Sequence, residues 1–161
     1  MADRDTLLAD LDAAREAFQE ALAEVDLELA TAPGVVGEWS VRDLVYHVAA
    51  WCEHGADALE LAMTGRGDAF AYARDQTDAM NERFMAEGRS VSPADALTRE
   101  ESAFGRFRER ISSLDPSLLT TRLGNGDTVE DVIVYDGREH YDEHTGQLRA
   151  WFAPEHEGDD A

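Results

Sequence analysis

Two histidines four residues apart, His140 and His144, have the spacing of metal ligands on one helix. Both lie within the apolar stripe of a predicted C-terminal helix, where this spacing puts one ring above the other. Buried imidazoles need polar partners, because an unsatisfied polar group in a protein core is costly. One divalent ion would satisfy both rings, since each nitrogen can approach it to about 2.1 Å. The alternative is that each ring is hydrogen-bonded inside the fold or lies at a wet end of it.

A metal site on this helix needs a third ligand, and His47 is the best candidate. It lies beside Leu44 and Trp51, on the flank of the apolar stripe of an earlier predicted helix, and so faces a groove between helices. His54, two turns further along, is a rival ligand or a surface residue. Three neutral imidazoles leave at least one coordination position open, where an ion lowers the pKa of bound water or thiol.

Two other metal chemistries are disfavoured by the spacing. Residues 140–144 fit the His-x-x-Glu-His pattern of inverted zinc peptidases, with Glu143 as general base. Those enzymes take a further carboxylate ligand from well downstream, and only seventeen residues follow His144. A ferritin-type di-iron centre requires Glu three residues before His on two helices, and no such pair is present.

Apolar residues recur at steps of three and four along most of the chain, a pattern that predicts helices. Ser40 and Ser92 are predicted N-caps, and Asp43 completes a capping box with Ser40. Asp127 and Glu130 are predicted to cap the last helix. The sequence therefore predicts an all-α four-helix bundle with an additional short helix in the central connection. The expected helices cover residues 5–30, 40–63, 69–87, 92–114 and 128–153.

The length of 161 residues fits one domain, which we expect over residues 1–154, followed by an acidic tail at 155–161. No apolar run is long enough to span a membrane, and the first residues lack the features of a signal peptide. We therefore expect a cytoplasmic protein. Cys52 is the only cysteine and is expected to be a small buried hydrophobic residue.

The formal net charge is −21 at pH 7, and every basic side chain is Arg or His because the chain contains no Lys. Such a surface repels phosphates and anionic lipid headgroups, so neither nucleic acids nor membranes are expected as partners. The excess of acidic residues fits either a solvated surface that keeps the protein soluble or adaptation to high salt.

Two segments of the chain resemble motifs of the DinB-like superfamily. The sequence GEWSVRDLVYHVAAW at 37–51 resembles that family's second helix, and HYDEH at 140–144, followed by QLRAW at 147–151, resembles its last helix. The resemblance extends from about residue 5 to 153. It implies a bundle with a down-up-up-down arrangement and a long central connection. It also implies that His47, His140 and His144 form the metal-ligand triad.

The same resemblance implies a divalent ion, usually zinc or nickel, a small-molecule substrate and a homodimer. Relatives include transferases and isomerases that use bacillithiol, mycothiol or glutathione, so a low-molecular-weight thiol is an expected cofactor. The leading hypothesis is therefore a metal-dependent thiol S-transferase that acts in detoxification.

The remaining candidate residues are assigned on their positions beside the triad. Glu143 is the candidate catalytic carboxylate, while Trp51 and Tyr141 either wall the cofactor pocket or are ordinary core residues. One alternative function is a metal-activated hydrolase. The other is a non-catalytic metal-binding stress protein, in which Cys52 or His54 would close the fourth coordination position.

Overall fold

The computed structural model describes residues 3–152, and their regular structure is helical. The expected acidic tail at 155–161 lies outside the described residues. Short 3-10 turns occupy the connections, and a π-helical turn, η5 (Val134–Glu139), joins α5 and α6 into one continuous last helix. The α-helices are α1 (Arg4–Ala23), α2 (Val41–Met63), α3 (Thr77–Gly88), α4 (Pro93–Ser113), α5 (Val129–Ile133) and α6 (His140–Phe152).

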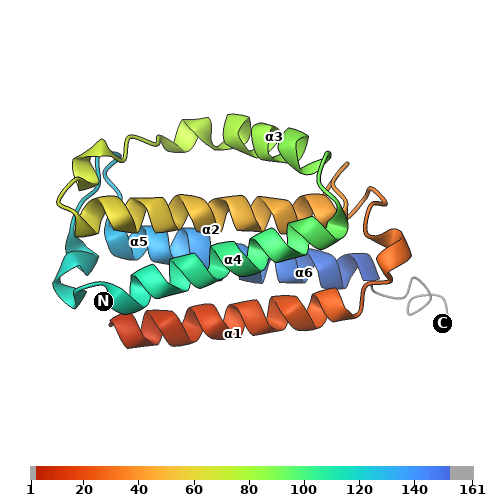
Figure 1. Ribbon diagram of the computed structural model, residues 1–161, viewed down its shortest axis with the longest axis horizontal. Helices are drawn as coiled ribbons and strands as arrows, with labels where there is room; N and C mark the ends of the chain where they lie inside the picture. Colours follow the sequence, from red (N-terminus) through yellow and green to blue (C-terminus); the bar gives the residue numbers. More distant parts are fainter. Residues whose placement is uncertain (1–2, 153–161) are drawn as a thin grey trace, which may run out of the picture.

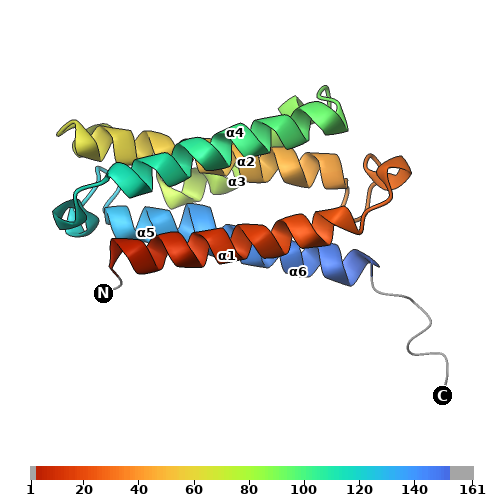
Figure 2. The same cartoon turned by 60° about the horizontal axis from the view of Figure 1, so that its bottom comes forward.

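The helices form a four-helix bundle with a fifth, shorter helix on its outside (Figures 1 and 2). Helix α1 and the last helix run in one direction, while α2 and α4 run in the other (Figure 1). Two parallel neighbours need a connection that returns along the length of the bundle, and α3, which packs against α2, lies within it. The predicted all-α bundle, its down-up-up-down arrangement and its short central helix are confirmed.

The N-terminus of α2 is built as the sequence predicts. The Ser40 hydroxyl accepts a hydrogen bond from the Asp43 backbone N–H at 3.2 Å, and the Asp43 carboxylate accepts one from the Ser40 N–H at 3.0 Å. This capping box satisfies two of the amides that a helix start leaves free. Asp43, only 3% exposed, is therefore a capping residue.

The last helix begins one residue later than predicted. Thr128 is its N-cap and forms a capping box with Asp131, so the predicted pair of Asp127 and Glu130 is wrong. The Asp127 carboxylate instead accepts a hydrogen bond from the Asn125 side chain within the preceding turn. A shift of one residue keeps the same spacing of capping groups, which is why the pattern alone did not separate the two.

Two predicted helices are shorter in the structure. The first ends at Ala23 rather than near residue 30, and residues 27–29 form a separate 3-10 turn, η1 (Leu27–Leu29). There the Asp26 carboxylate accepts a hydrogen bond from the Glu28 N–H at 3.0 Å, a local bond that competes with helix continuation. The third predicted helix begins at Thr77 rather than residue 69, after two 3-10 turns, η2 (Gly67–Ala69) and η3 (Arg74–Gln76).

The π-helical turn η5 was not predicted, and it changes which residues of the last helix face the core. A π-helix has an extra residue in its turn, so the buried face advances by one position. Beyond it Tyr141 is fully buried, while His140 lies at the edge of the core. Gly137 allows this turn to pack closely, because a Cβ there would lie 3.0 Å from Cδ1 of Leu11.

A buried polar network joins the four main helices near the middle of the bundle. Arg15 on α1 donates two hydrogen bonds of 2.9 Å to the Glu100 carboxylate on α4. Tyr141 on α6 donates one of 2.6 Å to the same carboxylate, and its hydroxyl lies 3.5 Å from Sγ of Cys52 on α2. Cys52 is fully buried, as expected, and burial raises the pKa of its thiol to about 12.

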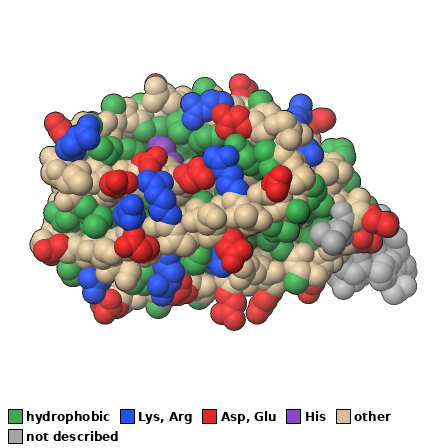
Figure 3. Space-filling model, viewed as in Figure 1, with side chains coloured by type: hydrophobic (Ala, Val, Ile, Leu, Met, Phe, Trp, Pro, Cys, Tyr) green, Lys and Arg blue, Asp and Glu red, His purple; other side chains and the backbone are tan. Residues whose placement is uncertain are grey.

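On the surface, arginines of α4 pair with acidic residues of α2. Arg99 binds Glu53, and Arg106 binds both Asp57 and Glu60, at distances between 2.7 and 3.0 Å. Basic and acidic side chains are therefore interspersed over the face seen in Figure 3, despite the large negative net charge. No helix within residues 3–152 is long and apolar enough to cross a membrane.

The polar network makes a prediction about stability. Replacing Glu100 by Gln leaves the Arg15 guanidinium without its buried counter-charge, and we expect a loss of about 3 kcal/mol in the free energy of unfolding, measured by urea denaturation. The neighbouring Glu101, which is exposed, provides the matched control: Glu101→Gln is expected to change stability by less than about 0.5 kcal/mol. Equal effects of the two substitutions would contradict the role of the network.

Candidate metal centre

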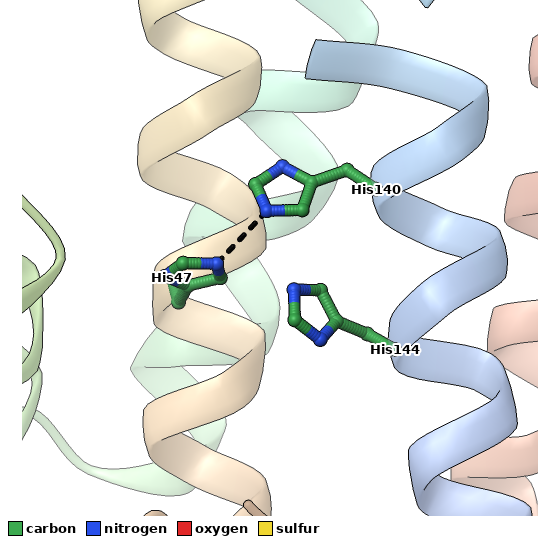
Figure 4. A group of neighbouring side chains, drawn as sticks. All are labelled: His47, His140 and His144. Atoms are coloured by element: carbon green, nitrogen blue, oxygen red, sulfur yellow. Dashed lines mark hydrogen bonds between the residues drawn. The ribbon is translucent and has the colours of Figure 1, made fainter. Parts of the chain in front are cut away.

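Three imidazoles converge between α2 and α6. His47 extends from α2, and His140 and His144 from successive turns of α6, so the rings face one another across the helix interface (Figure 4). Ring centroids are 4.8 to 4.9 Å apart for all three pairs. One ring nitrogen from each histidine lies within 4.8 Å of the other two. The residues selected from the sequence as metal ligands are therefore brought together at one place.

The hydrogen bonds of the cluster leave nitrogens without protein partners. Nε2 of His47 lies 2.9 Å from Nε2 of His140, so either one ring donates to the other or both bind the same ion. Nδ1 of His144 donates to the Gln147 amide oxygen at 2.6 Å, so Nε2 of His144 carries a lone pair. That Nε2 is buried without a partner, as is Nδ1 of both His47 and His140. Nε2 of His144 and the facing Nε2 atoms of His47 and His140 therefore form a set of buried imidazole nitrogens that fits a divalent ion.

Burial also sets the protonation state of the cluster. It lowers the pKa of His47 to about 2 and that of His140 to about 3, and the neighbouring rings add to both shifts. Burial lowers the pKa of His144 as well, while its hydrogen bond to Gln147 acts in the opposite direction. All three rings are therefore neutral near pH 7, which is the form that binds a metal ion.

Two tryptophan rings pack against the histidine cluster. The ring of Trp39 lies 4.6 Å from that of His47, and the ring of Trp51 lies 5.8 Å from that of His140, measured between centroids. Trp51 is itself fixed, because its indole N–H donates to the Asn81 side chain on α3 at 2.9 Å. The short helix of the central connection therefore helps to position the site.

A cavity of about 280 Å³ opens beside the cluster, and His140 is the member of the triad that borders it. The remaining walls combine aromatic rings with carboxylates. A small molecule in the cavity would lie against the ring of His140 and hence next to an ion held by the triad. The lining includes Trp51, His54, Phe70, Tyr72, Asp136, Glu139 and Glu143.

The other candidate residues differ in whether they line the cavity and in which side chain they contact. Trp51 and Glu143 line the cavity, and Glu143 is exposed there. Tyr141 does not line it: its side chain points into the core and donates to Glu100. Cys52 is occupied by Tyr141 and His54 by Asp136, so among the described residues neither joins the triad as a fourth ligand.

One pair in the cavity wall escaped the sequence reasoning. His54 Nδ1 lies 3.0 Å from the Asp136 carboxylate, which is almost fully buried. Burial raises the pKa of Asp136, and the hydrogen bond from His54 acts against that rise. The sequence carried a signal for this pair. Asp136 lies one helical turn before His140, and His54 lies two turns after His47, so each is on the same side of its helix as a member of the triad.

The lowered pKa values predict acid sensitivity of the metal-free protein. Unfolding returns each histidine toward its ordinary pKa of 6.5, so below that pH the unfolded chain binds more protons than the folded one. Stability conferred by the neutral rings is therefore present above 6.5 and lost as the pH falls, by about 1.4 kcal/mol per pH unit for each histidine.

This prediction is checked by urea denaturation between about pH 7 and pH 5 with and without His140→Gln. The variant retains the other titrating groups, so its stability is expected to fall less steeply than that of the unchanged protein. Identical slopes would show that His140 is not held neutral by the fold.

Comparisons with known proteins were made on the sequence and on the fold. No curated protein matches the sequence. Among solved structures, an uncharacterised protein of Escherichia coli UTI89 superposes with a TM-score of 0.81 at 18% identity, covering 99% of this chain and 96% of that one. A protein of Streptococcus pneumoniae superposes with a TM-score of 0.77 at 11% identity, covering 94% of this chain and 91% of that one. These TM-scores show a shared fold, and at such low identity the likeness extends to the fold alone.

A third structure corrects an expectation drawn from the net charge. The colibactin self-resistance protein ClbS, solved in complex with double-stranded DNA, superposes with a TM-score of 0.81 at 15% identity, covering 93% of this chain and 95% of that one. The exclusion of nucleic acid as a partner is therefore wrong. Net charge averages over the whole surface, whereas phosphates are contacted by particular side chains and backbone amides.

The sequence comparison identifies the family directly. The profile of the DinB superfamily matches residues 10–158, a span that contains both α2 with His47 and α6 with His140 and His144. This match covers nearly the whole chain. The chain therefore belongs to the DinB superfamily.

Proposed function

We propose that this protein is a divalent-metal-dependent enzyme that acts on a small reactive molecule, with His47, His140 and His144 as the ligands of one ion. The observation that carries the proposal is the convergence of three neutral, buried imidazoles, each with one ring nitrogen within 4.8 Å of the other two. Their donor set suits zinc or nickel. Membership of the DinB superfamily agrees with metal binding.

The residues around the triad support catalysis more than a purely structural ion. Structural zinc sites are usually closed by four protein ligands. Among the described residues this group contains three, and the cavity lies against one of them. A bound divalent ion supplies Lewis-acid activation of a thiol or water in the open position.

The chain's own side chains then bind and orient the reactants. Trp51, held by Asn81, forms an apolar wall against which a small molecule can pack. Glu143, an exposed residue of the cavity lining, is placed to exchange protons between the bound reactants and solvent. We propose transfer of a low-molecular-weight thiol to an electrophilic carbon as the reaction; hydrolysis is the outcome if water occupies the same place.

Metal binding is tested by elemental analysis of the purified protein. We expect about one zinc or nickel ion per chain in the unchanged protein and near-complete loss in His140→Gln, because two remaining imidazoles bind far more weakly. His54→Gln is the matched control, since His54 also faces the cavity but bonds to Asp136; it is expected to keep the ion. Equal metal content in both variants would contradict the assignment.

The reaction is tested by incubating the metal-loaded protein with bacillithiol, mycothiol or glutathione and a generic electrophile, 1-chloro-2,4-dinitrobenzene. We expect at least one thiol to give a thioether product at a rate that falls about a hundredfold in His140→Gln. Metal-dependent turnover of the electrophile to its hydroxylated product, unaffected by any thiol, would instead establish the hydrolase. Absence of metal-dependent turnover with all reactants would contradict the enzymatic proposal.

A further inference from the structure

His54 and Asp136 form a second polar pair in the cavity wall, apart from the histidine triad. They come from different elements, α2 and the π-helical turn η5, and meet at 3.0 Å between Nδ1 and a carboxylate oxygen. The Asp136 side chain is almost fully buried, whereas the His54 ring lines the cavity that His140 also borders. A cavity thus has an imidazole held by a carboxylate on one wall and a candidate metal ligand on another.

The hydrogen bond defines which nitrogen of His54 is available. A carboxylate accepts, so Nδ1 of a neutral His54 donates its proton to Asp136, and Nε2 carries the lone pair. An imidazole whose far nitrogen is held by a buried carboxylate is oriented for proton transfer and, once protonated, is stabilised by the adjacent negative charge. This is the arrangement of a general base.

Aromatic packing fixes the ring of His54 in this orientation. Its centroid lies 4.9 Å from that of Trp51, 4.8 Å from Tyr72 and 5.0 Å from Phe70. All three rings also line the cavity. A planar molecule in the cavity would therefore pack among aromatic rings with the base of His54 at the same wall.

The π-helical turn supplies the carboxylate. It is the irregular part of the last helix, and π-helical turns are frequent at functional sites. Within it, Asp136 is buried one turn before His140, so a single stretch of chain delivers both the carboxylate for His54 and a ligand of the triad. A pair needed only for packing would not require its imidazole to border a cavity.

We propose that His54 accepts a proton from the molecule bound in the cavity and that Asp136 is its positioning residue. This rests on the proposed function, in which that molecule reacts beside the ion. For a thiol, the S–H bond breaks and the proton moves to Nε2 of His54. The sulfur electron pair forms the bond to the electrophilic carbon, and the leaving group departs with the electron pair of its own bond.

A base in an aromatic cavity is tested with a probe that needs only proton removal, 5-nitrobenzisoxazole. Nε2 of His54 takes the proton from carbon, the C–H electron pair forms a carbon–nitrogen triple bond, and the nitrogen–oxygen bond breaks to release a coloured phenolate. We expect the full-length protein to accelerate this elimination, both as purified and after dialysis against a chelator. We expect kcat/KM to fall at least about tenfold in His54→Gln.

Asp142→Asn is the matched control for this assay. Asp142 is exposed on α6 and does not line the cavity, so its loss of charge is expected to leave the rate unchanged. A wild-type rate in His54→Gln would overturn the proposal, as would a rate in the unchanged protein no higher than that of free imidazole at the same concentration. Circular dichroism of each variant establishes that it is folded.

The role of Asp136 is tested by a readout that simple packing would not move. Nitrogen-15 NMR of the unchanged protein is expected to show His54 in one tautomer, protonated on Nδ1, and Asp136→Asn a mixture of both. The same variant is expected to lower kcat several-fold with KM unchanged. An unaltered tautomer and kcat would overturn the positioning role.

The chelator arm separates this proposal from the proposed function. If the triad binds no metal but the elimination depends on His54, the proposed metal-dependent function is wrong and the role of His54 as a base is supported. If the ion is present and the elimination does not depend on His54, the role of His54 as a base is wrong and the metal-dependent function is unaffected.

Discussion

Three neutral imidazoles, packed against one another between two helices, are the constraint on which the rest of this structure depends. A buried nitrogen without a partner costs about 1 to 3 kcal/mol, and the cluster contains one such nitrogen in each of His47, His140 and His144. The rings cannot relieve this by taking up protons, because burial lowers the pKa of every one. A divalent cation at the facing nitrogens would satisfy the lone pair on Nε2 of His144 and replace the contact between Nε2 of His47 and Nε2 of His140, and it would be held by rings that are already oriented.

The surrounding bundle explains how the rings keep that orientation. Tyr141 lies between the two ligands of α6 in sequence, and its hydrogen bond to Glu100, itself held by Arg15, restrains rotation of α6 about its own axis. The same rotation that buries Tyr141 turns His140 and His144 toward α2. Tyr141 therefore contributes to the site by positioning its neighbours and does not line the cavity. On the other helix, the capping box of Ser40 and Asp43 sets the start of α2 two turns before His47 and so defines where that ring emerges.

Local patterns in the sequence predicted the parts of the molecule that local chemistry determines. The capping box at Ser40, the apolar stripes and the spacing of His140 and His144 led to the bundle and to three histidines that lie together in the structure. The π-helical turn could not be predicted in this way, because its sequence carries no local pattern that distinguishes it from an α-helix, and its close approach to Leu11 at Gly137 is a tertiary contact. Asp136 lies within that turn and meets His54, and Tyr141, just beyond it, enters the core, which is the second of the two alternatives left open for this residue. The exclusion of nucleic acid was wrong for a different reason, since it took the total charge as a measure of every part of the surface.

The central claim is that the three imidazoles bind the same ion, and X-ray absorption spectroscopy at the metal edge tests it most directly. For the zinc- or nickel-loaded protein, the account predicts three imidazole nitrogens at about 2.0 to 2.1 Å, with lighter oxygen or nitrogen scatterers completing the shell. It also predicts no sulfur, because Cys52 is buried against Tyr141. A spectrum with fewer than three imidazoles, or with a sulfur ligand near 2.3 Å, would contradict the account.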